Sequence, residues 1–414
     1  MNRTMTREER TENYCAAILQ SMTLDIAAVQ QALRDDGLDG WLLYDFHGSN
    51  PISRRVAGLS TAAKLTTRRW YYLIPSDGPA RGLVHSIERD RLDHLPGEKT
   101  EYAQYEEFQA GLRSLVKTGA TLAMEYSPNC AIPYISRIDG GTIDVVRALG
   151  AEIRSSGDLI QRFEAVWDEA ALATHQTAAQ ALYSIKDQAF ALVRERIRSH
   201  TPVTEFEVQD AMSGWFEDAE LISDSRPVVA AQENAGDPHY LPTQPRHRII
   251  DSDEILLLDL WGKLTTPGAV YADITWMGFT GTSVPPRYAD AFDVIRQGRD
   301  AAVAFVQDGV QQGRSLHGWQ VDRTARQLID TAGFGDQFVH RTGHSLGEAV
   351  HGNGVNLDDF ETHDERRLLP GTAVTVEPGI YFDDFGLRTE INLHVGSDTA
   401  TVTGPRQDAI LLLG

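Results

Sequence analysis

The chain is poor in cysteine, with only Cys15 and Cys130 among its 414 residues. Two thiols cannot supply a disulfide framework, and so low a number is typical of proteins that fold in a reducing compartment. Long apolar runs are lacking as well, because no stretch approaches the roughly 20 residues that a membrane helix needs. The first ten residues are polar and do not form the apolar centre of a signal peptide. We therefore expect a cytoplasmic protein without a membrane partner.

Positive charge is also scarce, since 38 Lys and Arg residues face 59 Asp and Glu residues, for a formal net charge of −21. Such a charge repels phosphate backbones and anionic lipid surfaces, which argues against nucleic acid as a partner. The composition, 42% hydrophobic and 23% charged, is that of an ordinary globular protein. At this length the chain exceeds one ordinary core, so we expect two domains.

The first part of the chain alternates short β-rich runs with helical stretches, a pattern typical of an α/β layer. Ser155, Ser156 and Gly157 precede a long helical pattern, which places the domain boundary near Glu164 and predicts domains 1–164 and 165–414. The expected strands are 40–44, 70–74, 83–87 and 121–126, and the expected helices are 24–35 and 107–116.

The second part combines helices with closely spaced strands. Apolar residues at helical spacing predict helices from Asp168 onward, after Pro286, and over 316–332 with Gly333 as the C-cap. The expected strands are 255–260, 273–279, 374–377, 388–395 and 409–413. Strands that follow each other so closely favour antiparallel hairpins. The fold class expected for the whole chain is therefore α+β.

Carboxylates occur inside the apolar strands of this second part. Asp259 ends the run Ile-Leu-Leu-Leu-Asp, while Asp273 and Glu377 have similarly apolar neighbours. Burying an unpaired carboxylate costs several kcal/mol, about 2 to 7 for a polar group and more for a charge. Such clustering requires a compensating positive charge, which either metal ions or a network of Arg and Lys side chains can provide.

Two further residues complete a set of oxygen and nitrogen ligands: His344 in His-Ser-Leu-Gly-Glu and Glu390 in Arg-Thr-Glu. Two divalent ions about 3.5 Å apart can share a hydroxide and stabilise a tetrahedral intermediate, as amide hydrolysis at neutral pH requires. The five residues Asp259, Asp273, His344, Glu377 and Glu390 therefore predict a dinuclear metal centre in a hydrolase.

The order Asp, Asp, His, Glu, Glu resembles the pita-bread-fold metallopeptidases, which include methionine aminopeptidase, Xaa-Pro aminopeptidase and the Xaa-Pro dipeptidases known as prolidases. The resemblance covers residues 165–414, and the N-terminal part is similar to the accessory domain of the proline-specific branch and of creatinase. It implies that Asp259 binds one ion alone, that Asp273 and Glu390 bridge two ions, and that His344 and Glu377 complete the second. It implies two divalent ions per subunit, with Mn²⁺ favoured and Co²⁺, Zn²⁺ or Fe²⁺ as alternatives.

The resemblance also implies roles around these ligands. His239 and His351 match histidines that contact the scissile region, whereas a lone histidine is more often structural. His340 matches a residue behind the ligands, and Tyr240 in Pro-His-Tyr is taken as a substrate-binding or supporting residue. Arg388 lies on the same side of its strand as Glu390, where it orients that carboxylate, binds substrate or forms a structural salt bridge.

The expected reaction is hydrolysis of the bond between an N-terminal residue and proline in small peptides, by a metal-bridging hydroxide whose proton Glu377 relays to the leaving nitrogen. The alternatives are a non-catalytic scaffold that binds peptides or proteins, a methionine aminopeptidase-like activity, and an organophosphate hydrolase side activity. The resemblance implies a homodimer or homotetramer.

Two departures from the pattern of these relatives are visible. Their two aspartates are usually eleven positions apart, whereas Asp259 and Asp273 are fourteen apart. Three residues added within a paired strand would turn a side chain to the other face, so we expect them in the hairpin loop, near 265–268, or in a bulge. Trp276 stands where relatives usually carry Arg, so any supporting role of that Arg is lost or reassigned.

Overall fold

The structure is a computed structural model that describes residues 24–59 and 66–414, so Cys15 lies outside the described residues. The chain divides into two compact units between Phe163 and Glu164, one residue before the predicted boundary. Within the described residues no helix is long and apolar enough to pass through a bilayer.

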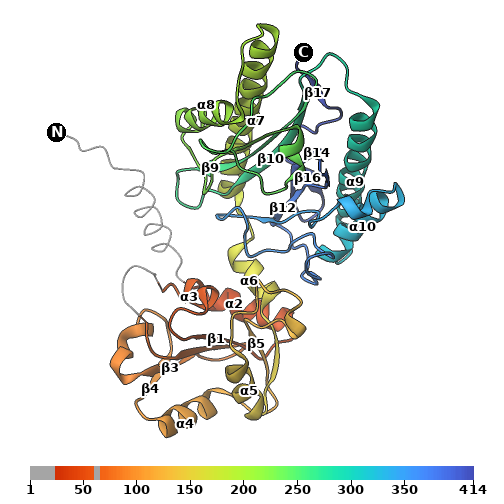
Figure 1. Cartoon of the computed structure of the whole chain (residues 1–414). Helices are drawn as coiled ribbons and strands as arrows, with labels where there is room; N and C mark the ends of the chain where they lie inside the picture. The colour runs from red at the N-terminus through yellow and green to blue at the C-terminus, as the bar shows by residue number, and fades with distance from the viewer. Residues whose placement is uncertain (1–23, 60–65) are drawn as a thin grey trace, which may run out of the picture. The chain divides into compact units, whose positions relative to one another are not determined.

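A six-stranded mixed sheet forms the centre of the N-terminal unit (Figure 1). The β1–β2 and β2–β3 pairs are antiparallel, whereas β3–β4, β1–β5 and β5–β6 are parallel. Across the sheet the strands are β4 (Glu98–Tyr102), β3 (Arg81–His85), β2 (Trp70–Pro75), β1 (Gly40–Asp45), β5 (Thr121–Met124) and β6 (Glu152–Ser155). The helices are α2 (Ile26–Asp35), α3 (Pro51–Val56), α4 (Tyr105–Leu115), α5 (Gly140–Ala148) and α6 (Gly157–Glu164), with short 3₁₀ helices at Ser86–Leu92 and Pro128–Cys130.

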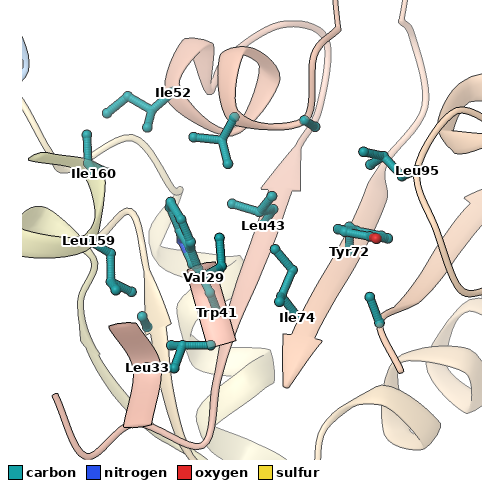
Figure 2. Packing of buried hydrophobic residues seen from close by; sticks show 14 of the residues in the cluster. Val29, Leu33, Trp41, Leu43, Ile52, Tyr72, Ile74, Leu95, Leu159 and Ile160 are labelled. Atoms are coloured by element: carbon teal, nitrogen blue, oxygen red, sulfur yellow. The ribbon is translucent and has the colours of Figure 1, made fainter. Parts of the chain in front are cut away.

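Helices cover both faces of this sheet because the strands are apolar on both sides. On one face Trp41 and Leu43 pack with α2, α3 and α6, as Figure 2 shows for the labelled side chains of this cluster. On the other face Leu42 and Tyr44 pack with α4 and α5. The unit is thus a three-layer α/β domain, as the alternating pattern predicted.

Two details of the N-terminal prediction are wrong. The strand expected at 83–87 lies at Arg81–His85, because the chain turns into a 3₁₀ helix at Ser86, where the His85 ring accepts a hydrogen bond from the Ile87 amide. The strand expected at 121–126 ends at Met124, where the chain turns and the Tyr126 amide donates to the Met124 carbonyl.

The C-terminal unit packs helices against two main sheets (Figure 1). Helices α7 and α8 cover one face of β9 and β10, whereas α9 packs against their other face and, with α10, against the second sheet. The helices are α7 (Glu169–Arg198), α8 (Glu205–Asp218), α9 (Pro286–Gln311) and α10 (Gly318–Thr331), with 3₁₀ helices at Gln232–Gly236 and Gly335–Gln337. The first sheet contains β17 (Leu411–Leu412), β10 (Ala272–Phe279), β9 (Ile255–Leu264) and β7 (Leu221–Ile222), with β8 (Val228–Ala231) also paired to β9. The second contains β11 (Ser345–Leu346), β12 (Ala373–Val376), β15 (Ile391–Val395) and β16 (Ala400–Val402), and β13 (Gly379–Phe382) pairs with β14 (Phe385–Arg388).

The β9–β10 hairpin is the most regular element of this unit. Its antiparallel ladder runs without a bulge from Phe279 opposite Ile255 to Ala272 opposite Gly262. The additional residues between the two aspartates therefore lie beyond the paired stretch, in a connection that includes the exposed residues 265–268. This is where the sequence placed them.

Three predicted strands of the C-terminal unit are wrong in extent, since 255–260 continues to Leu264, 409–413 shortens to Leu411–Leu412, and 388–395 is divided. The run 388–395 is interrupted at Thr389 and Glu390, so that Arg388 ends β14 and Ile391 begins β15. The two strands belong to different sheets, β14 with β13 and β15 with β12. Glu390 thus lies at a junction between sheets, where its backbone amide donates to the carbonyl of Thr275.

Candidate metal centre

The hairpin β9–β10 carries two of the predicted ligands on one face. Asp259 is directly opposite Thr275 in the ladder, and Asp273 is two residues before Thr275 on the same strand. Opposite residues and alternate residues share a face of an antiparallel pair. The two aspartates therefore point to the same side of the sheet.

The other predicted ligands come from the ends of the second sheet. His344 directly precedes β11, Glu377 follows β12, and Glu390 directly precedes β15. Because β12 pairs with both β11 and β15, these three ends converge. Asn392 joins this sheet to the hairpin, because its side chain accepts from the Asp273 amide at 3.1 Å and donates to the Asp273 carbonyl at 2.5 Å.

Three of the five residues form a compact set of ligand atoms. Asp273, His344 and Glu390 are buried, and each offers one atom within 4.8 Å of the others. Glu377 lies at the same place, with its Oε1 3.4 Å from Nε2 of His344, and Oδ2 of Asp273 lies 3.6 Å from that nitrogen. The set has the size and the donor atoms of a divalent metal site.

The hydrogen bonding of these ligand side chains leaves acceptor atoms free for a cation. Oδ1 of Asp273 and Oε1 of Glu390 are buried, and neither has a hydrogen-bond partner among the described residues. Nδ1 of His344 lies 3.2 Å from the carbonyl of Ser345, to which it donates, so the lone pair on Nε2 faces the carboxylates of Asp273 and Glu377. Buried acceptors that face one another in this way require a positive charge between them.

The protonation preferences support the same conclusion. Burial, followed by the mutual repulsion of the carboxylates, holds the pKa of both Asp273 and Glu390 well above the usual range. Burial also raises the pKa of Asp259 despite the nearby Arg388. Burial alone would raise the pKa of Glu377, but His344 and His340 in their protonated forms, together with the permanent charge of Arg388, lower it. Without an added cation, the carboxylates of Asp273 and Glu390 therefore resist ionisation in the folded state.

Asp259 differs from the other four because it already has a cationic partner. Its Oδ2 accepts a hydrogen bond from Arg388 at 2.5 Å, and its side chain is only 14% exposed. Arg388 also donates to Thr275 Oγ1 at 2.9 Å, and Thr275 donates to Glu390 Oε2 at 2.7 Å. Of the roles considered for Arg388, the structure shows the salt bridge, whereas its link to Glu390 passes through Thr275.

A second chain of hydrogen bonds runs from Arg388 to the half-buried His340. Arg388 donates to the hydroxyl of Tyr381 at 3.0 Å, and that hydroxyl lies 2.9 Å from Nε2 of His340. Nδ1 of His340 is 2.7 Å from the carbonyl of Arg341, so Nδ1 donates and Nε2 accepts from Tyr381. Burial lowers the pKa of His340, which keeps this ring neutral, as the chain of donors requires.

The model of metallopeptidase family M24 matches residues 174–397. That match covers more than half of the chain and includes all five predicted ligands. The chain belongs to metallopeptidase family M24. It is 28% identical over 265 residues to a putative dipeptidase, YkvY, of Bacillus subtilis, in an alignment covering 64% of this chain and 67% of that protein. It is 29% identical over 164 residues to an Xaa-Pro dipeptidase of Lactobacillus helveticus, covering 39% of this chain and only 40% of that protein.

Solved structures share the fold of this M24 chain. Dipeptidase PepE from Mycobacterium ulcerans superposes with a TM-score of 0.66 at 21% identity, covering 97% of this chain and 98% of that one. A prolidase from Thermococcus sibiricus gives a TM-score of 0.58 at 20% identity, covering 95% and 100%. An X-prolyl aminopeptidase from Caenorhabditis elegans, described as having a di-nuclear active site, gives 0.60 at 15% identity, covering 95% of this chain and 64% of that one. These likenesses confirm the predicted α+β fold with an N-terminal domain before the M24 domain.

The remaining predicted site residues of this M24 chain lie at different depths. The ring of His351 is 4.4 Å from that of His344, with an outer edge open to solvent. Its enclosed part is desolvated, and this, with the charges of His344 and Arg341, lowers the pKa of His351 to about 4. His239 is exposed, and its amide donates to Asp237.

Tyr240 contacts a buried carboxylate, which agrees with a supporting position, and its substrate contact stays a prediction. Its hydroxyl donates to Oε2 of the buried Glu205 at 2.6 Å, and the side chain is 2% exposed. Glu205 also accepts from the amides of Ala231 and Arg248. Tyr240 therefore anchors the loop that carries His239, and the mechanism proposed below does not depend on a substrate contact from it.

Trp276 points away from the metal centre. It packs in the core between the β9–β10 hairpin and α7, and Nζ of Lys186 lies 3.9 Å above its ring. The adjacent Thr275 faces the ligands, so Trp276 must face the other side of the strand. The cation that contacts Trp276 is Lys186, and Trp276 does not support the metal ligands.

Several supporting residues were missed by the sequence reasoning. Thr275, Thr375 and Asn392 contact Glu390, Glu377 and Asp273 respectively, and Tyr381 joins Arg388 to His340. Thr275, Thr375 and Asn392 each lie two positions from a ligand, on the same face of the chain. Alternation around each ligand would have found these three, whereas Tyr381 has no such signal.

Proposed function

We propose that this chain is a peptidase that uses two divalent metal ions, most favourably Mn²⁺, to hydrolyse the bond between an N-terminal residue and proline in small peptides. The observation that carries the proposal is the pair of buried, unpartnered oxygens on Asp273 and Glu390 beside the lone pair of His344. Membership of M24 and the Xaa-Pro dipeptidase among the relatives support the reaction class and the proline preference.

Asp273, His344, Glu390 and Glu377 would hold one ion, and Asp259, together with the bridging carboxylates, would hold the second. Two bound ions would polarise the peptide carbonyl and lower the pKa of the attacking water towards about 7. The second position depends on Asp259, whose carboxylate would keep Oδ2 on Arg388 and offer its other oxygen.

Glu377 is suited to move the proton. Its lowered pKa keeps it ionised at neutral pH, so it can accept a proton from the attacking water and deliver it to the leaving nitrogen. Thr375 Oγ1 donates to Glu377 Oε1 at 3.1 Å and holds the carboxylate in place. His351, whose ring lies against that of His344, and the exposed His239 would donate hydrogen bonds to the carbonyl oxygen as negative charge develops there.

The first test is Glu377→Gln in metal-saturated protein, assayed on Ala-Pro and Ala-Pro-Ala. Loss of a positioned general base lowers kcat by about 10² to 10⁴ while the fold survives. Glu195→Gln, at an exposed carboxylate on α7, is the matched control and retains the wild-type rate. A near wild-type rate in Glu377→Gln would refute the assigned role.

The competing function is a non-catalytic scaffold, and the Asp259–Arg388 salt bridge is the observation that favours it. Metal analysis after reconstitution separates the two, because the peptidase binds two ions per chain and the scaffold binds none. Cleavage of Met-Ala-Ser alone among these peptides would instead indicate a methionine aminopeptidase-like activity. Dimer or tetramer assembly and a cytoplasmic location stay predictions.

A further inference from the structure

Trp261 lies beside the metal centre on the same face as the ligands. It is directly opposite Asp273 in the β9–β10 ladder and two residues after Asp259. Side chains at opposite positions share a face, with Cβ atoms about 5 Å apart. The indole therefore forms a wall immediately next to Asp273, and the mechanism above does not use it.

Asp224 continues this row onto a third strand. Strand β7 pairs with β9 so that Leu221 is opposite Leu264 and Ile222 is opposite Lys263. Extending this register by two positions places Asp224 opposite Trp261, and the contact agrees, since Nε1 of Trp261 donates to Oδ1 of Asp224 at 2.6 Å. Asp273, Trp261 and Asp224 thus lie side by side across β10, β9 and the extension of β7.

Asp224 is an exposed carboxylate whose charge has no ion-pair partner among the described residues. Only its Oδ1 accepts a hydrogen bond in the part of the chain that the structure describes. The nearest arginine in sequence, Arg226, is bound to Asp210 at 2.6 Å and lies over the ring of Phe206.

We propose that Asp224 and Trp261 form the subsite for a basic side chain, Lys or Arg, on the residue that precedes the scissile bond. The carboxylate pairs with the ammonium or guanidinium group, and the indole face contacts its apolar stem and cation. The net charge of −21 favours the approach of such substrates. This inference rests on the proposed peptidase function, and it adds a preference among Xaa-Pro substrates.

The test compares kcat/KM for Arg-Pro and norleucyl-Pro on the metal-loaded, full-length protein. The norleucyl side chain matches the stem of the arginyl side chain, and only the arginyl peptide carries a cation. Wild type should prefer Arg-Pro, and the ratio of the two values should fall by about 10- to 100-fold in Asp224→Asn, mostly through KM. Asp224→Lys should reverse the preference towards Glu-Pro, and Asp218→Asn, at an exposed carboxylate at the end of α8, should leave the ratio as in wild type.

Four results would overturn the inference. Wild-type kcat/KM on both peptides in Asp224→Asn would show that the carboxylate does not contact the substrate side chain. An equal loss on both peptides would assign it to positioning the site or to the free α-ammonium. Absence of turnover of either peptide by wild type would remove the proposed function, and the subsite with it, whereas turnover of norleucyl-Pro without charge preference would remove only the subsite.

Discussion

Glu125 in the N-terminal unit and Asp273 in the C-terminal unit are both buried carboxylates at a sheet, but their oxygens are treated in opposite ways. Glu125 follows β5 and is fully buried. Its oxygens accept hydrogen bonds from four neutral donors, namely Trp41 Nε1, Asn50 Nδ2, Ser53 Oγ and Ser156 Oγ. Asp273 receives no side-chain donor, and one of its oxygens has no partner among the described residues.

This difference shows how a structural buried carboxylate can be distinguished from a ligand-binding one. Burial raises the pKa of both side chains, so neither burial nor the direction of the pKa shift separates them. What separates them is whether the surrounding chain supplies the donors. Glu125 holds together β1, α3 and the segment before α6, and thus supports the N-terminal fold, whereas Asp273 is incomplete without a ligand that the chain does not contain.

The largest effect is expected from Asp273→Asn. Loss of a metal ligand should lower kcat/KM by more than about 100-fold, beyond the 10- to 100-fold typical of partners behind the ligands. In metal-free protein the same change replaces an acceptor oxygen that receives no hydrogen bond, so thermal stability should stay equal or rise. Metal content by elemental analysis and calorimetric unfolding measure the two parts. Wild-type metal content and activity in the variant would contradict the comparison.

Glu125→Gln is the matched change in the other unit and should have the opposite pattern. In either orientation the amide nitrogen faces Trp41 Nε1 or Asn50 Nδ2, neither of which can accept. The N-terminal unit should lose about 1 to 3 kcal/mol of stability. Hydrogen exchange of β1 and β5 measures this loss, while metal content per folded chain stays at two ions. A variant as stable as wild type would show that the four donors do not hold this carboxyl.

A smaller effect on activity is expected from Tyr381→Phe. The change removes the hydroxyl between Arg388 and His340 but no metal ligand. Losing such a supporting contact should lower kcat/KM by about tenfold. A loss as large as that of Asp273→Asn would mean that Tyr381 itself contacts the reacting groups.

The smallest effect is a pH dependence of stability in the metal-free protein. The pKa values of Asp273 and Glu390 in the folded state lie well above the usual 3.8 and 4.5. Between the unfolded and the folded pKa of each group, the folded state therefore binds more protons than the unfolded state. Their contribution to stability is therefore complete below about pH 4 and is lost as pH rises through the folded pKa values. Saturating metal should reverse this trend in the C-terminal unit, because metal binding requires deprotonated carboxylates. Denaturant unfolding from pH 4 to 8 with chelator or Mn²⁺ measures both trends, and identical slopes would contradict them.

Much of the site could be predicted because its residues obey local rules. Asp259 and Asp273 lie in a hairpin whose antiparallel register and alternation place them on a common face. The long helices were visible from their apolar periodicity. Helix α8 was missed although Thr204 and Glu207 form a capping box at its start.

The partner of Asp259 was beyond such rules. Arg388 lies 129 residues away along the chain, and its position at the end of β14 depends on the break between β14 and β15. Periodicity cannot reveal that the run from Arg388 to Val395 divides between two sheets, because sheet membership depends on pairing with distant strands. The same holds for Tyr381, which reaches Arg388 only because β13 and β14 pair.

The loop that closes the β9–β10 hairpin has a practical consequence. Residues 265–268 are exposed and lie outside the ladder, which remains regular up to Gly262 and Ala272. Added length at this turn leaves the facing of both aspartates unchanged. An epitope tag or a small fluorescent reporter inserted after Pro267 should therefore be tolerated, and it would offer an internal label on a catalytic unit whose ends need not be modified.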